Sequence, residues 1–136
     1  MSTSTIRQLP YGYERELSDV SHEEAINKVT LVLQDKGFGV LTEIDVKATM
    51  KKKLDKDYPK YKILGACNAK LADRALSTDT HISLLMPCNV VVREAGDKVL
   101  VSIMNPQLLA SVSDDKELHQ VATEAEKLVK EVLEEL

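Results

Sequence analysis

The sequence predicts an α+β fold with two layers, in which a mixed or largely antiparallel sheet has helices packed on one face. The main indication is the order of the patterns, in which strand and helix patterns alternate before two consecutive strands and a final helix. The size agrees, since 136 residues with 43% hydrophobic and 29% charged side chains suit one globular core. We therefore expect an N-terminal tail over residues 1–10 and a single domain over residues 11–136.

The first strand and helix are predicted between residues 11 and 37. Residues 11–17 alternate loosely between larger and smaller side chains, which favours a half-buried strand. Ser21 and Glu24 form the pattern of a capping box, so a helix is expected to begin there. Its apolar residues recur at helical spacing, and Gly37 can adopt the left-handed conformation that ends a helix.

The middle of the chain predicts two further strands, each followed by a helix. Residues 38–44 have the composition of a strand, and residues 46–54 that of a short, lysine-rich helix. Tyr58-Pro59 interrupts the helical pattern, because the residue before a proline is disfavoured in the helical region. A strand is expected over residues 61–67, and Asn68 can cap a helix that continues to about Leu76.

The last third begins with two apolar runs, residues 82–86 and 90–92, which we interpret as buried strand segments separated by Pro87. Residues 89–94 and 98–104 predict a hairpin with Gly96 in its turn, and one hairpin strand is expected to keep an unpaired edge. A loop is expected over residues 107–113. A final helix follows, with an apolar stripe of Val121, Ala125, Leu128, Val132 and Leu133.

Charge and composition exclude several classes of function. A net charge of −4 gives no basic field for a nucleic acid, although Lys51-Lys52-Lys53 is locally basic. The N-terminal residues lack the apolar stretch of a secretion signal or membrane span, so we expect a cytoplasmic protein without membrane contact. Two cysteines are too few for a disulfide framework and are expected to remain thiols.

Two Cys-Asn pairs are the most distinctive feature of the sequence. They occur in Gly65-Ala66-Cys67-Asn68 and in Pro87-Cys88-Asn89, each where a predicted strand ends or bends. If these segments are neighbours in the sheet, the two thiols and two amides could hold a ligand. The candidate ligand-binding residues are Gly65, Cys67, Asn68, Cys88 and Asn89.

The chemistry of these residues leaves three functions open. The first is a homodimeric binding module for a small molecule or a thiol-seeking ion. The second is a thiol-dependent enzyme or redox protein using Cys67, whose thiolate a helix N-terminus would stabilise. The third is a structural or interaction protein in which both cysteines are small buried hydrophobes. No catalytic residue is assigned, although His81 beside Asp79 could act as a base.

No metal or cofactor can be named from these residues. Zinc is not expected, because structural zinc sites use four closely spaced Cys or His ligands and here no C-x-x-C occurs. Copper(I) accepts thiolate and thioether sulfur, so Cys67, Cys88 and Met86 form a possible set. Met86 ends an apolar run, however, which also suits a core position.

The segments 62–68 and 84–94, which contain both Cys-Asn pairs, resemble an uncharacterised bacterial family known as domain of unknown function 302. The resemblance covers most of the chain from Tyr11. It implies a compact α+β domain that pairs as a homodimer. The family often has a proline after the first Cys-Asn and Asp-Pro after the hairpin, where this chain has Ala69 and Asn105.

Overall fold

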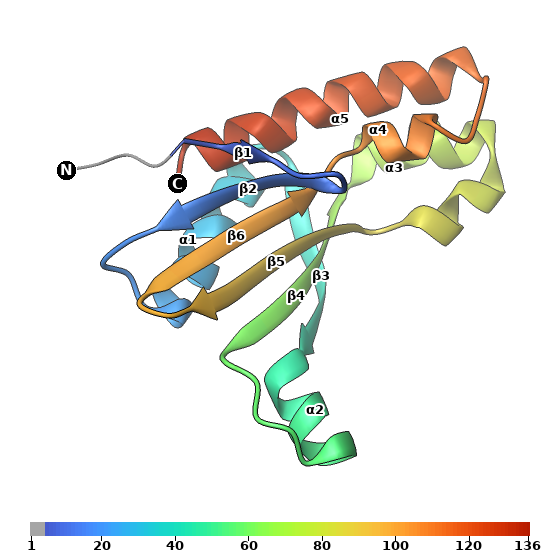
Figure 1. Cartoon of the computed structure of the whole chain (residues 1–136). Helices are drawn as coiled ribbons and strands as arrows, with labels where there is room; N and C mark the ends of the chain where they lie inside the picture. The colour runs from blue at the N-terminus through green and yellow to red at the C-terminus, as the bar shows by residue number, and fades with distance from the viewer. Residues whose placement is uncertain (1–4) are drawn as a thin grey trace.

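The computed structural model describes residues 5–136 and has the predicted α+β architecture, with a six-stranded sheet as one layer (Figure 1). The sheet order is β1-β2-β6-β5-β4-β3, and all neighbouring strands are antiparallel. The hairpin strands β5 and β6 therefore lie inside the sheet. The strands are β1 (Arg7–Gln8), β2 (Gly12–Leu17), β3 (Phe38–Asp45), β4 (Tyr61–Asn68), β5 (Cys88–Ala95) and β6 (Lys98–Met104).

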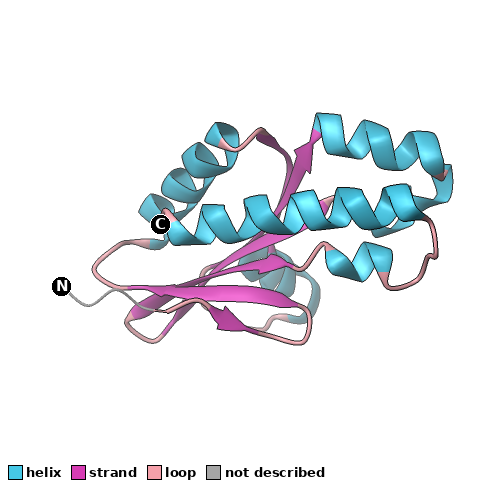
Figure 2. Ribbon diagram, turned by 90° about the horizontal axis from the view of Figure 1, so that it is seen from above, coloured by secondary structure: helices cyan, strands magenta, loops and turns pink. Residues whose placement is uncertain are grey.

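The two longest helices form the second layer and lie on the same side of the sheet (Figure 2). The predicted capping box is present, since the Ser21 hydroxyl accepts from the Glu24 backbone N–H while the Glu24 carboxylate accepts from the Ser21 N–H. Gly37 follows that helix with a φ of 87°. The helices are α1 (His22–Asp35), α2 (Val46–Leu54), α3 (Ala69–Thr78), the 3-10 helix η1 (Thr80–Leu85), α4 (Gln107–Ala110) and α5 (Lys116–Glu134).

The main core lies between the sheet and the helices α1 and α5. Alternate residues of the inner strands point into it, because successive side chains of a strand face opposite sides of the sheet. Val90 and Val92 of β5 are fully buried there, whereas Val91 between them is half-buried on the opposite face. The fully buried side chains of this core are Val29, Leu33, Leu64, Val90, Val92, Val101, Ile103, Val129, Val132 and Leu133.

The opposite face of the sheet carries no long helix (Figures 1 and 2). The strand register aligns Ile44, Ile63 and Val91 with Ser102 and Glu14 in one row across this face. Ile44 is half exposed, and Ile63 and Val91 are half-buried. The single chain thus leaves apolar side chains of β3, β4 and β5 in contact with solvent on this face.

The carboxylate of Glu14 lies buried on this face among polar partners from the neighbouring strands. It accepts from Arg7 Nη2 at 2.6 Å and from the Ser102 hydroxyl at 2.7 Å, and Arg93 Nη2 lies 3.6 Å away. Two cations and one hydroxyl therefore compensate the buried charge, as a buried carboxylate requires.

Four sequence-based expectations are wrong. Within the expected tail, Arg7 and Gln8 form β1 against β2, while residues 1–4 lie outside the described part. Residues 82–86 do not form a strand but belong mostly to η1, which the Asp79 carboxylate caps at the His81 N–H. The expected loop over residues 107–113 contains α4. The unpaired edges belong to β1 and β3 instead of the hairpin, since β2 and β4 cover its two sides.

The wrong prediction of a strand over residues 82–86 has a simple physical cause. An apolar run predicts a buried strand only if its side chains find apolar neighbours, and here Ile82 is buried whereas Leu84 is 84% exposed.

None of the helices in residues 5–136 has the length and apolarity needed to cross a bilayer.

Candidate functional site

The pairing of β4 with β5 brings the two Cys-Asn segments side by side. Gly65 is the register partner of Asn89, and Ala66 is the partner of Cys88. Cys67 is therefore offset from Cys88 by one residue along the ladder. The adjacency that the sequence left open is present in the structure, and both cysteines are free thiols that line one cavity.

The cavity has a volume of about 70 Å³ and lies where two hydrophobic clusters meet. Phe38 and Ala66 contribute from the main core, and Leu71 and Val121 from a smaller cluster between α3 and α5. Met86 and Cys88 line it from either side of Pro87. In the part of the chain that the structure describes, no charged side chain lines this cavity.

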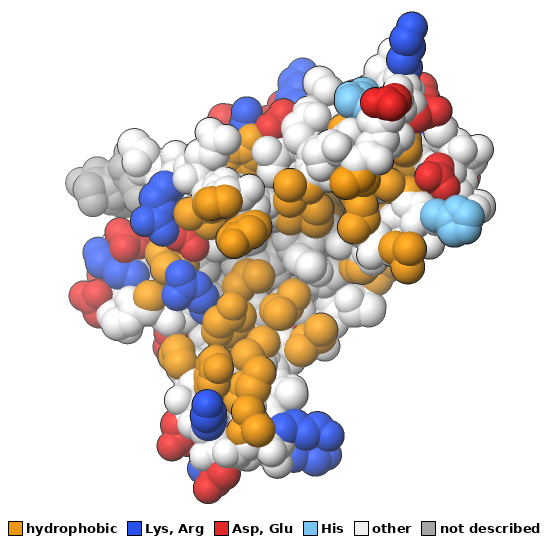
Figure 3. Space-filling model, turned by 45° about the vertical axis from the view of Figure 1, so that its right-hand side comes forward, with side chains coloured by type: hydrophobic (Ala, Val, Ile, Leu, Met, Phe, Trp, Pro, Cys, Tyr) orange, Lys and Arg blue, Asp and Glu red, His pale blue; other side chains and the backbone are white. Residues whose placement is uncertain are grey.

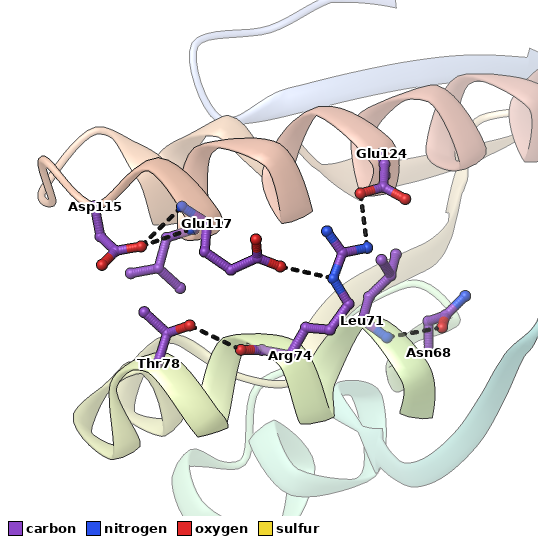
Figure 4. A network of polar contacts seen from close by, with 8 residues as sticks. Asn68, Leu71, Arg74, Thr78, Asp115, Glu117 and Glu124 are labelled. Carbon is purple, nitrogen blue, oxygen red and sulfur yellow. Dashed lines mark hydrogen bonds and ion pairs between the residues drawn. The ribbon is translucent and has the colours of Figure 1, made fainter.

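The α3 wall of the cavity is fixed at its start and along its length (Figure 4). Asn68 caps α3 as expected, its side-chain oxygen accepting from the Leu71 N–H at 3.2 Å. Arg74 joins α3 to α5 through Glu117 at 2.8 Å and Glu124 at 2.7 Å. These contacts hold α3 against α5, so the cavity between them and the sheet is part of the folded structure.

The two thiols differ in their surroundings. Burial, and to a lesser extent the nearby Cys67, raises the pKa of Cys88 to about 12. Within residues 5–136, no Lys, Arg or His lines the cavity to stabilise a thiolate. Cys88 is therefore a neutral thiol at pH 7. Both cysteines are half-buried, and Cys67 lies at the end of β4, one residue before the N-cap of α3.

Gly65 supports the site without lining the cavity. A Cβ atom at this position would lie 2.1 Å from Thr42 Oγ1 and 2.9 Å from Pro87 Cγ. Only a glycine allows β3 and Pro87 to approach β4 this closely. Pro87 in turn fixes the segment that brings Met86 and Cys88 to the cavity.

Asn89 lies outside the cavity, in an adjoining surface groove of about 340 Å³. The groove is formed by η1, α4 and the ends of β5 and β6. Five residues line both spaces: Leu85, Met86, Pro87, Met104 and Leu109. The structure thus groups Cys67, Asn68 and Cys88 around the inner cavity and puts Asn89 at the outer groove.

Several lining residues were not singled out from the sequence. Phe38, Leu71, Met104 and Leu109 come from four separate segments and have ordinary hydrophobic side chains, so no local motif identifies them. Of the predicted chemical groups, His81 is 89% exposed beside Asp79 and is not among the cavity residues. No cluster of three or more His, Cys, Asp or Glu suited to a metal ion occurs among the described residues.

These features define a small α+β domain with an apolar, thiol-containing cavity at one end of its sheet. The family model described as "Domain of unknown function DUF302" matches residues 13–136, and the chain belongs to this family. The resemblance noted from the two Cys-Asn segments is thereby confirmed.

A solved structure supports the same assignment. The chain is similar to an uncharacterised conserved DUF302 protein from Bacillus stearothermophilus, with 25% sequence identity and a TM-score of 0.84. The similarity covers 93% of this chain and 98% of that chain. No curated protein matches the sequence.

Proposed function

We propose that the protein is a homodimeric binding module, and that the cavity beside Cys67, Asn68 and Cys88 holds a small, neutral, apolar ligand. The observation that carries this proposal is the uncharged lining of the cavity, including a Cys88 thiol whose pKa lies near 12. Charged ligands would find no compensating group there. We expect both cysteines to remain thiols in the cytoplasm.

The size of the cavity limits the ligand. Its volume of about 70 Å³ is roughly half that of the ~150 Å³ cavity that accommodates benzene in a protein core. Pockets for drug-sized ligands measure about 300–1,000 Å³. The inner cavity therefore suits a group of a few heavy atoms.

The two alternatives that depend on a thiolate receive less support from this geometry. Removing the proton from a thiol of pKa about 12 costs about 7 kcal/mol at pH 7, and an ion bound by Cys88 would have to offset that cost. An enzyme using Cys67 needs a base, and His81 is not at the cavity.

The sheet face that carries no long helix supports the homodimer. Ile44, Ile63 and Val91 present apolar surface there, and the charge of Glu14 is already compensated by Arg7 and Arg93. Burying this face against a second copy would supply a second layer on that side. Light scattering is expected to give about twice the chain mass of 15.1 kDa, and a monomer at micromolar concentration would contradict this part of the proposal.

The ligand is tested with 1-butanol as a neutral probe, observed by saturation-transfer NMR. The Ala72→Leu variant fills the cavity from α3 and is expected to abolish the signal. Ala69→Leu is the matched control, because Ala69 is exposed on the same helix and does not line the cavity. Binding of silver(I) that is lost in Cys67→Ser, without any butanol signal, would instead support a thiol-seeking ion.

A further inference from the structure

The inner cavity and the outer groove share a wall that contains two methionines. Met86 and Met104 line both spaces, together with Leu85, Pro87 and Leu109. Methionine is unbranched and flexible, so it can change rotamer to admit a neighbouring group at low cost. A wall of this composition can open between the two spaces without moving the backbone.

The outer groove is as uncharged as the inner cavity. Asn89 is its only polar side chain, and no lining residue of either space in the described chain carries a charge. Leu84 and Leu108 at the groove are exposed to solvent, at 84% and 39%. Figure 3 shows hydrophobic side chains gathered over this side of the molecule and continuing over the sheet, with most charges at its margins.

We propose that the natural ligand carries an unbranched alkyl chain, with one end in the cavity beside Cys88 and the rest passing between Met86 and Met104 into the groove. This inference rests on the proposed binding function and names the class of ligand. The volumes support it, since the inner cavity of about 70 Å³ holds only a few carbon atoms whereas the groove of about 340 Å³ has room for a longer chain. Both spaces suit methylene groups and offer nothing to a charged one.

The shape of the path makes the proposal specific for straight chains. We expect a branched ligand to bind less well, because it needs a wider opening between the two methionines than a straight chain does. Asn89 at the groove can hydrogen-bond to a hydroxyl or carbonyl at the far end of the chain. The ligand class is therefore a neutral, straight-chain amphiphile such as a fatty alcohol.

The test is a series of straight-chain primary alcohols from butanol to decanol, with affinities measured by ligand-observed NMR. Affinity is expected to rise by about three- to four-fold for each added methylene until the groove is filled. Met86→Ile and Met104→Ile put stiff, β-branched side chains in the wall and should abolish this rise in affinity with chain length. Met50→Ile in α2 is the control, because Met50 lines neither space.

Leu108→Glu is a second variant on the exposed side of the groove and avoids changes to the core. It should weaken decanol binding and leave butanol binding unchanged, because only the longer chain reaches Leu108. Butanol binding without any gain from chain length would overturn the alkyl-chain inference and leave the binding function intact. Absence of butanol binding would overturn the binding function itself.

Discussion

Gly65 is the position where a single added methyl group tests the architecture of the site most severely. In Gly65→Ala the new Cβ would lie 2.1 Å from Thr42 Oγ1 and 2.9 Å from Pro87 Cγ, so both neighbours must shift. Overpacking of this kind costs about 1–3 kcal/mol. Replacing glycine also lowers the entropy of the unfolded chain, which returns about 0.4–1 kcal/mol. We expect a net loss of about 1–2 kcal/mol in the free energy of unfolding.

Urea denaturation followed by circular dichroism measures this loss, and the neighbouring strand provides a matched control. Gly39→Ala makes the same change on β3, where an added Cβ would meet nothing within 4 Å, and is expected to be neutral or slightly stabilising. Thr42→Ala removes one of the two contacts and should recover part of the loss when combined with Gly65→Ala. Equal stability of Gly65→Ala and the wild type would refute the close approach of Pro87 to β4.

Three further predictions concern the thiols, the sheet and a buried tyrosine. Timed alkylation with peptide mapping at pH 7 should modify Cys67 well before Cys88. The Cys88 thiol, with a pKa of about 12, is ionised in only about one molecule in 10⁵ at this pH. Equal rates for the two cysteines would contradict the burial of Cys88. Val90→Asp puts a charge in the core and should unfold the protein. Val91→Asp should give a folded monomer, as measured by circular dichroism and light scattering. Equal unfolding of both variants would contradict the assignment of Val90 and Val91 to opposite faces of the sheet. Burial and the hydrogen bond to Glu126 raise the pKa of Tyr13 from 10.0 to about 12. The stability that this tyrosine contributes is therefore complete below pH 10 and is lost as the pH rises to about 12. Tyr13→Phe should remove this loss of stability at high pH, and a variant with the same pH profile as the wild type would contradict the prediction.

The fold class could be predicted because local signals agreed with tertiary packing in most elements. Ser21 and Glu24 predicted the start of α1, and Asn68 predicted the start of α3, since capping depends on residues close in sequence. The turn at Gly96 was predicted for the same reason, and its φ of 64° suits a glycine. The strand order could not be predicted, because it depends on contacts between distant segments.

Val91 shows that the sequence pattern of a strand does not predict which face of the sheet is buried. The run Val90-Val91-Val92 indicated a strand inside the sheet, which predicts that Val91→Asp buries a charge and largely unfolds the protein. In the structure only Val90 and Val92 face the helices, because α1 and α5 cover one face and leave the other open. A uniform apolar run gives no sign of which face is covered.

The candidate site was predicted in part. Cysteine and asparagine are conspicuous residue types, so Cys67, Asn68 and Cys88 could be singled out, and their segments do pair. The cavity itself could not be predicted, because its existence depends on Leu71, Val121 and Met104 meeting from separate elements. The volume of the cavity and its lack of charge decide between an ion and an apolar ligand. Both properties arise only when these separate elements pack together.

A crystal structure of the protein under xenon pressure shows whether the space beside Cys67 and Cys88 is an apolar cavity that a neutral ligand can enter. Xenon is a small, uncharged and polarisable atom that enters apolar cavities in proteins. We expect a xenon atom bounded by Phe38, Leu71 and Cys88, with both cysteines as free thiols. A cavity without xenon, or an ion held between Cys67 and Cys88, would contradict this expectation.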